Sequence, residues 1–161
     1  MPIRKRKISY TLNLEKELEE ANVSKGKRAK ATKEAGEVAR QSILSDTNSL
    51  RSSVHRGKYK AKLSKKYRDA KAALGKGKRA NLRLDQKMLS NLRVSSTKKD
   101  FTIKITDPME KKKASGHNRG DYNGGVKRQF LPDDSKRQRF RDEIKARILK
   151  VIEKYKGDPS E

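Results

Sequence analysis

Residues 92–105 read LRVSSTKKDFTIKI, and this stretch decides the fold class. In its second half, apolar residues at Phe101, Ile103 and Ile105 alternate with polar ones, which is the period of a strand with one buried face. Its first half runs from Leu92 to Thr97, and a polar Lys-Lys-Asp segment separates the two halves. We therefore predict an antiparallel β-hairpin, because two strand patterns joined by a short polar turn fold back on each other.

Helical patterns lie on both sides of this hairpin. Upstream, from Ala31 to Leu44, small and apolar residues share one helix face, and the alanine-rich face predicts close packing. The polar residues from Asp46 onward read as the end of that helix. Downstream, a long helix is expected after Asp133 and Asp134, whose charges suit the start of a helix. Its apolar positions are Phe140, Ile144, Ile148, Val151, Ile152 and Tyr155.

Shorter patterns complete the predicted secondary structure. Residues 8–14 either form a strand or lead into a helix, for which Asn13 would be the N-cap. Further helices are expected at 64–74 and 85–92, and a short third strand at 126–131. The stretches 75–80 and 111–125 are rich in glycine and polar residues and have no periodicity, so we expect loops there.

Together these patterns predict an α+β fold. We expect a small antiparallel β-sheet with packed helices, a long C-terminal helix, and extended basic arms or loops. Residues 1–30 are expected to form a basic N-terminal arm and first helix. Residues 31–156 would form the α+β domain, with mobile loops near 75–80 and 107–126, and residues 157–161 a short C-terminal tail.

The charge balance predicts an acidic partner. Lys and Arg total 44 and Asp and Glu total 20, which gives a formal net charge of +24. Such a charge repels itself, so a polyanion or an acidic protein surface is expected to offset it. Only 31% of the residues are hydrophobic, which suggests that neighbouring subunits complete the burial. Aromatic residues are 5% and Trp is absent, which argues against base stacking on single strands.

Composition also limits the compartment and the cross-links. The chain has no Cys, which excludes disulfides and thiolate metal sites and is compatible with folding in the cytosol. No apolar run approaches the length of a membrane span. The basic residues 1–7 are not followed by the apolar core of a secretory signal, so we expect none.

No constellation of residues supports catalysis. His55 and His117 have no metal-ligand spacing to other donors and read as loop residues that form hydrogen bonds. Ser64 and Ser135 lack a nucleophile motif. The Gly-Lys-Gly-Lys segment at 75–78 lacks the trailing Ser or Thr of a phosphate-binding loop. We therefore expect no enzyme, and no catalytic residue, metal, cofactor or small-molecule substrate.

The order of motifs in the middle of the chain resembles a known family. Gly57 and Tyr59 precede a Leu-Ser pair at 63–64, and Tyr67 and Lys71 follow. A leucine-rich segment comes next, with Asn81, Leu82, Leu84, Met88, Leu89 and Leu92. This pattern resembles the phage virion morphogenesis family, which includes the tail-completion protein of Mu-like phages.

The second part of the resemblance lies at 114–131. The His-Asn-Arg-Gly sequence at 117–120 is similar to the family's His-Asn/Gln-x-Gly loop, and residues 128–131 are similar to its Arg-x-Phe/Leu-Leu segment. The terminal amphipathic helix follows in the same order. The matched segments run from Ala35 to Tyr155, which is most of the chain.

The resemblance implies a structural protein of a tailed bacteriophage. It implies tail completion, or a tail terminator, at the head–tail joint in the neck of the virion. Copies would assemble in the host cytoplasm into an oligomeric ring, a hexamer, that caps the tail and helps to join it to the head. The implied partners are neighbouring neck and tail tube proteins and genomic DNA in the lumen, with no membrane.

Four basic runs are candidate contacts for DNA or acidic protein surfaces, because lysine and arginine bind phosphates without reading bases. One run is 25–30, and the residues singled out in the others are Arg4, Lys5, Arg6, Lys7, Lys76, Lys78, Arg79, Lys111, Lys112 and Lys113. Apolar residues expected in the core or at a subunit interface are Phe101, Ile103, Ile105, Phe130, Leu131, Phe140, Ile144 and Ile148.

A second class of function fits the composition almost as well. A basic RNA-binding structural protein of the ribosomal type would also be rich in lysine and arginine and free of Cys and Trp. The ordered motifs at 59–92 and 117–131 favour the virion interpretation, because an RNA-binding role does not explain them. A nuclease would need a cluster of metal-binding carboxylates, and the sequence shows none.

Overall fold

The computed structural model describes residues 8–48, 52, 54, 69, 73, 90–108, 110, 111, 114, 129–132 and 138–157. Its elements follow in the order β1 (Ser9–Asn13), α1 (Glu15–Glu20), α2 (Lys25–Asn48), β2 (Leu92–Ser96), β3 (Asp100–Ile105) and α6 (Asp142–Lys154). The predicted α+β class is confirmed. The helix predicted at 64–74 and the loop predicted at 75–80 lie outside the described residues, apart from Asp69 and Ala73. Of the helix predicted at 85–92, residues 90–92 are described: Ser90 is helical, but Leu92 is already the first residue of β2.

The strands form one antiparallel sheet in the order β1-β3-β2. The predicted hairpin is confirmed as β2 and β3. Both outer strands align with the central strand at Ile103, which lies opposite Tyr10 of β1 and Val94 of β2. Because residues directly opposite each other point to the same face, these side chains form one apolar layer.

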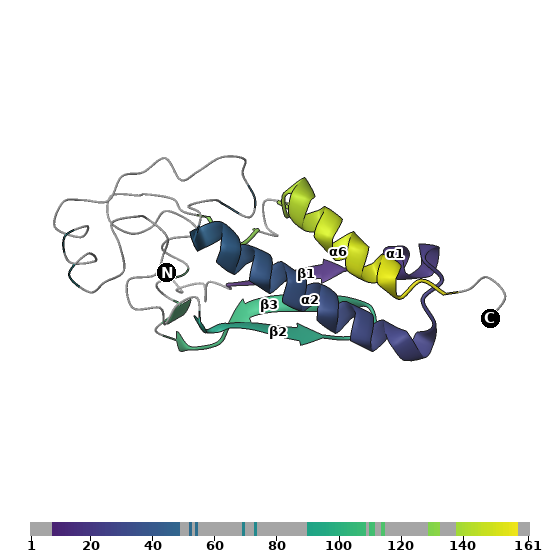
Figure 1. Ribbon diagram of the computed structural model, residues 1–161. Helices are drawn as coiled ribbons and strands as arrows, with labels where there is room; N and C mark the ends of the chain where they lie inside the picture. The colour runs from purple at the N-terminus through teal and green to yellow at the C-terminus, as the bar shows by residue number, and fades with distance from the viewer. Residues whose placement is uncertain are drawn as a thin grey trace.

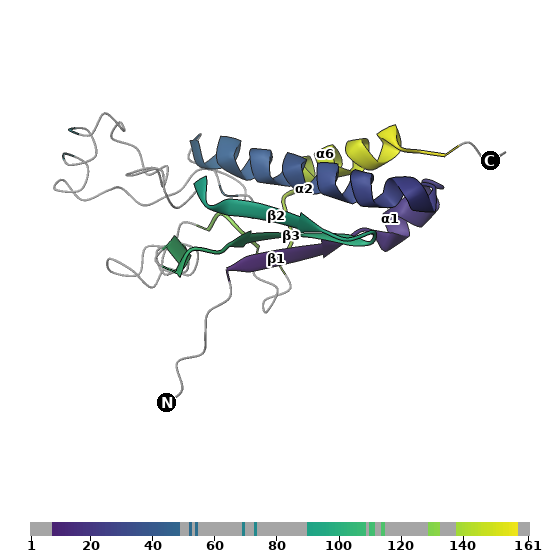
Figure 2. The ribbon, with the colours of Figure 1, turned by 90° about the horizontal axis from the view of Figure 1, so that it is seen from below.

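Both long helices lie on this apolar face. α2 and α6 run side by side across the sheet (Figure 1), and the view from below places them on one side of it (Figure 2). The other face of the sheet carries polar residues, with Arg93 opposite Lys104 and Ser95 opposite Thr102. The buried apolar core therefore lies between one layer of strands and one layer of helices.

α2 contacts both the sheet and α6 because its side chains are small. Ala31, Ala35 and Ala39 are fully buried along it. At Gly36 the helix backbone approaches the sheet so closely that an added Cβ would lie 2.5 Å from Cγ1 of Val94. Small residues at these positions allow an approach that larger side chains would prevent.

The helix boundaries differ from the sequence prediction. α2 begins at Lys25, six residues before the predicted start, and continues to Asn48, so Asp46 lies within the helix and not in a turn. α6 begins at Asp142, well after Asp133 and Asp134. Asp142 and Glu143 occupy its first turn, so they carry the favourable interaction with the helix dipole that the earlier acidic pair was expected to supply.

Residues after β3 also differ from the prediction. Lys111 and Ala114, expected in a loop, are helical, and the Lys111 backbone N–H donates to the Asp107 carbonyl at 2.8 Å. The Asp107 side chain accepts from the Glu110 backbone N–H at 3.1 Å. The Asp-Pro-x-Glu sequence at 107–110 thus begins a helix, since Asp is a good N-cap and Pro suits the first helical position.

The third strand was predicted in the wrong place. Within 126–131, the described residues from Gln129 are not in a strand, and Phe130 and Leu131 are both buried. Successive residues of a strand point to opposite faces, so two adjacent buried side chains do not fit a strand with one solvent face. The third strand is β1, which is one of the two alternatives for residues 8–14.

The N-terminal segment belongs to the same fold as the rest of the described chain. β1 pairs with β3, and Leu14, Leu18 and Val23 are buried in the shared core. The boundary expected at residue 30 falls inside α2. Asn13 is not the N-cap that the sequence suggests, because Leu14 occupies that position without a side-chain cap hydrogen bond. The Asn13 Oδ1 instead accepts from the Glu15 backbone N–H at 2.9 Å, in the turn that leads into α1.

The close approach at Gly36 gives a stability prediction. Alanine normally stabilises a helix interior by about 1 kcal/mol relative to glycine. Gly36→Ala is expected instead to destabilise the protein by about 1–3 kcal/mol, because the new methyl group meets Val94 and Phe101. Gly26→Ala is the matched control in the same helix, since no atom lies within 4 Å of its added Cβ. Urea unfolding of the two variants should give shifts of opposite sign, and equal shifts would contradict the proposed contact.

Candidate polyanion interface

The N-terminal turns of α2 carry a cluster of exposed cations. Lys25, Lys27, Lys30 and Lys33 are exposed, and the first turn of the helix has no acidic residue. Backbone N–H groups make this end of a helix partly positive, so lysines here oppose the usual charge preference. The result is a locally high positive potential at one end of the molecule.

The turn of the β2–β3 hairpin adds a further cation to the same end. The Thr97 side chain forms hydrogen bonds with Asp100 and with the Lys99 backbone N–H, which fix the turn. The Thr32 hydroxyl of α2 donates to the Thr97 carbonyl, so the turn is held against the helix. Lys98 is exposed at the tip of this turn.

These five lysines, Lys25, Lys27, Lys30, Lys33 and Lys98, are called the basic end. Within the described part of the chain, none of them lies within ion-pair distance of a carboxylate. Neighbouring Lys99 differs, because its Nζ lies 3.4 Å from Oε1 of Glu15. The basic end therefore keeps its positive charges available to an external anion.

The end of α6 is fixed beside the basic end. Nζ of Lys154 lies 2.7 Å from Oε1 of Glu34, and the Tyr155 hydroxyl donates to the same carboxylate. The hydrogen bond from Lys154, followed by that from Tyr155, lowers the pKa of Glu34 below its ordinary value. The same contacts raise the pKa of Lys154 and of Tyr155. The two contacts hold this carboxylate at the end of α6, and Lys30 acts on it only through space, from beyond ion-pair distance.

Most of the predicted contact residues lie outside the described residues. These are Arg4, Lys5, Arg6, Lys7, Lys76, Lys78, Arg79, Lys112 and Lys113. Lys111 is described and exposed, but it follows the end of β3 that is remote from the hairpin turn, so it does not join the basic end. The run at 25–30 does lie there, whereas no local pattern indicates that Lys98 would join it.

The predicted apolar residues all lie in the core of the single chain. Phe101, Ile103, Ile105, Phe130, Leu131, Phe140, Ile144 and Ile148 are between 0% and 7% exposed. Among the residues that the structure describes, the exposed large hydrophobic side chain is Leu149, at 39%. These eight side chains are therefore packed without a neighbouring subunit.

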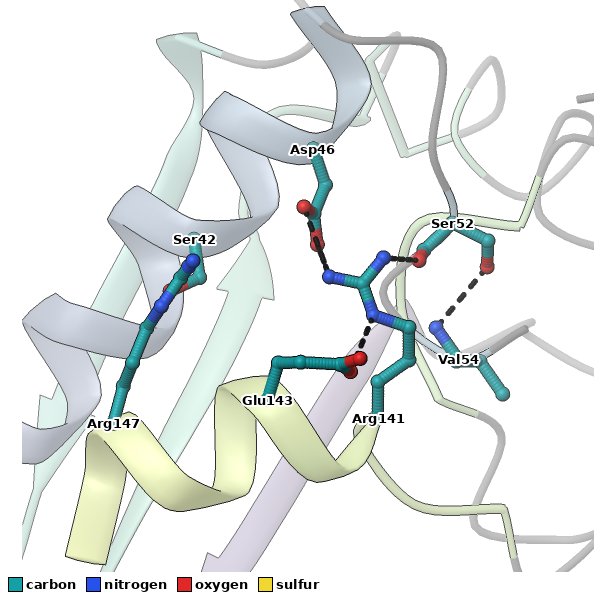
Figure 3. Close-up of polar contacts among 7 residues, drawn as sticks. All are labelled: Ser42, Asp46, Ser52, Val54, Arg141, Glu143 and Arg147. Atoms are coloured by element: carbon teal, nitrogen blue, oxygen red, sulfur yellow. Dashed lines mark hydrogen bonds and ion pairs between the residues drawn. The ribbon is translucent and has the colours of Figure 1, made fainter. Parts of the chain in front are cut away.

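A second polar cluster lies at the other end of the helix pair and is buried. The Arg141 guanidinium donates from Nη2 to both oxygens of Asp46, at 3.0 and 3.1 Å, and from Nη1 to the Ser52 carbonyl (Figure 3). Its Nε lies 3.3 Å from Oε2 of Glu143. The side chains of Arg141 and Asp46 are only 8% and 9% exposed, so this cluster connects α2 to the start of α6 and does not face a ligand.

The acidic side chains of the described residues do not gather into a metal site. No group of three His, Asp or Glu residues within them is arranged to hold a metal ion. No helix in the same part of the chain is long and apolar enough to cross a membrane. His55 and His117 lie outside the described residues.

Comparison with known proteins adds no relative: no family model, curated protein or solved structure matches this chain.

The buried pair gives a second stability prediction. Arg141→Met is expected to destabilise the protein by about 3–5 kcal/mol, because it leaves the Asp46 carboxylate buried without its partner. Arg141→Lys should restore little, since an ammonium group cannot reach Asp46 and Ser52 together in the same planar geometry. Lys156→Gln is the control, because it breaks an exposed pair and should change stability by less than about 1 kcal/mol. If Arg141→Met and Lys156→Gln destabilised the protein by similar amounts, the buried Arg141–Asp46 pair would not have the stabilising role assigned to it.

The basic end gives a binding prediction. Replacing Lys25, Lys27, Lys30 and Lys98 with Gln should weaken binding to duplex DNA and reduce the slope of log affinity against log salt by about 0.9 for each phosphate that is no longer neutralised. The matched control replaces four lysines elsewhere: Lys16, Lys104, Lys145 and Lys150. Titration at several salt concentrations measures both variants. If both variants bound DNA equally weakly, affinity would depend on the total charge of the protein and not on the basic end.

Proposed function

We propose that this chain is a non-enzymatic structural protein of a tailed-phage virion that acts in tail completion at the head–tail joint. Two lines support the proposal. The first is the ordered resemblance to the phage virion morphogenesis family from Ala35 to Tyr155. The second is a buried apolar core together with a cluster of exposed lysines that form no ion pair with a described residue.

The basic end is the observation that carries the proposal. Five exposed lysines, none of them within ion-pair distance of a described carboxylate, lie on the start of a helix and an adjacent turn that a hydrogen bond holds together. Lysine ammonium groups attract phosphates without geometric selectivity, unlike the planar fork of arginine. Such contacts would hold DNA of any sequence and would still let it move, which suits a channel through which a genome passes.

In this proposal, copies of the chain form a ring that caps the tail and contacts neighbouring neck and tail tube proteins. The basic end would face either the lumen, where the DNA lies, or an acidic surface of the adjoining ring. A net charge of +24 per copy makes a ring without such an anion strongly self-repelling. Assembly is therefore expected to depend on the partner and to weaken as salt rises.

Immunogold labelling of purified virions tests this function. With an antibody raised against the chain, negative-stain images are expected to show label at a single position between head and tail. Label distributed along the tail or over the capsid would contradict the tail-completion role.

The RNA-binding alternative predicts a different result, which sedimentation measures. If the protein instead sedimented with ribosomal particles, selectively for RNA and in a salt-dependent way, the virion proposal would fail.

A further inference from the structure

β1 pairs with β3 along one edge, and no described strand pairs with it along the other. The Ile105 backbone N–H donates to the Ile8 carbonyl, and the Leu14 N–H donates to the Lys99 carbonyl. In an antiparallel ladder the residues between such pairs direct their N–H and C=O groups away from the partner strand. These are Ser9, Thr11 and Asn13, and no described residue forms a hydrogen bond with their backbone groups on that side.

A groove of about 390 Å³ lies between this strand and α6. Tyr10 and Leu12 line it from β1, and Phe140, Ile148 and Leu149 line it from α6 and the segment before its start. The rings of Tyr10 and Phe140 pack edge to face, with centroids 5.0 Å apart. Leu149 presents a large hydrophobic side chain that is exposed to solvent. An apolar groove therefore lies directly beside unpaired strand backbone.

The charged residues of the groove favour an acidic occupant. Lys16, Arg139 and Lys145 line it, against one carboxylate, that of Glu17. All three cations are exposed, and Arg139 and Lys145 have no ion pair within the described residues. A second copy of this chain would bring a further +24 of charge to the groove, so it is a poor candidate.

We infer that β1 and α6 form a docking groove for an extended acidic segment of a different protein, which adds to the sheet as a fourth strand. The added strand would pair with Ser9, Thr11 and Asn13 and would place apolar side chains at alternate positions against Phe140 and Leu149. Its acidic residues would lie near Arg139, Lys145 and Lys16. β1 has five residues, so a segment of about that length fills the edge.

The inference does not depend on the virion proposal. It rests on the open edge, the groove and their charges, whereas the virion proposal rests on the basic end and the family resemblance. The basic end lies at the hairpin turn and the start of α2, and none of its lysines lines the groove. Failure of one proposal therefore leaves the other standing.

A synthetic peptide provides the probe. We would use fluorescein-labelled Glu-Val-Glu-Val-Glu-Val-Glu with blocked ends, and two versions of it that are N-methylated at the three valines or at the last three glutamates. Alternate N–H groups of a strand point to the same edge, so each version keeps one edge for pairing. Strand addition predicts that one version binds as the parent peptide does and that the other binds at least tenfold more weakly.

Two substitutions locate the site. Leu149→Glu should weaken binding of the parent peptide at least tenfold, whereas Lys150→Gln, which changes the net charge by the same amount on the next residue, should leave it unchanged within twofold. Thr11→Pro removes one outward N–H, a change that edge strands tolerate, and it should also weaken binding. Urea midpoints near that of the parent protein establish that these variants fold.

Amide hydrogen exchange gives an independent measurement. Saturation with the parent peptide should slow exchange of the Ser9, Thr11 and Asn13 N–H groups at least tenfold. Equal affinity for both N-methylated peptides, or unchanged exchange at these residues, would overturn the inference. So would self-association of the free protein that Leu149→Glu abolishes, because the occupant would then be a second copy.

Discussion

The structure depends on how closely one helix approaches its neighbours. α2 is the only described helix that contacts both the sheet and α6 along most of its length, and it does so through Ala31, Ala35, Ala39 and the backbone at Gly36. These small side chains let α2 pack closely against both the sheet and α6, around a core built from few apolar residues. In a chain with 31% hydrophobic residues, close packing of small side chains allows the available apolar groups to be fully buried.

Charge is distributed unevenly around this core. Three acidic residues form contacts between elements: Asp46 binds Arg141, Glu34 binds Lys154 and Tyr155, and Glu15 lies near Lys99. These pairs fix both ends of the α2–α6 contact and the hairpin turn. Because Lys and Arg outnumber Asp and Glu by 44 to 20, cations remain in excess at the surface, and the five lysines of the basic end lie together there. The same contacts that hold the fold thus create the surface proposed to bind a polyanion.

The hairpin and the apolar faces of the two long helices were predictable, because alternation and helical spacing act over a few neighbouring residues. The boundaries were not. Asp133 and Asp134 resemble a helix start as well as Asp142 and Glu143 do, but α6 begins at Asp142, directly after Arg141, which binds Asp46 of α2. Likewise, the prediction of a loop after Asp107 is wrong at its start, where a helix begins. The spacing of Asp107 to Glu110 is a known signal for the start of a helix.

By itself the sequence determined the fold class, the excess of positive charge and the identity of the core side chains, since these follow from local periodicity and composition. Only the tertiary structure decided that β1 lies at the edge of the described sheet, that Lys98 joins the α2 lysines, and that Arg141 is buried against Asp46. Each of these brings together residues far apart in the chain: Thr32 and Thr97 at the turn, or Asp46 and Arg141 between the helices. Such pairings depend on packing in three dimensions, and no local pattern encodes them.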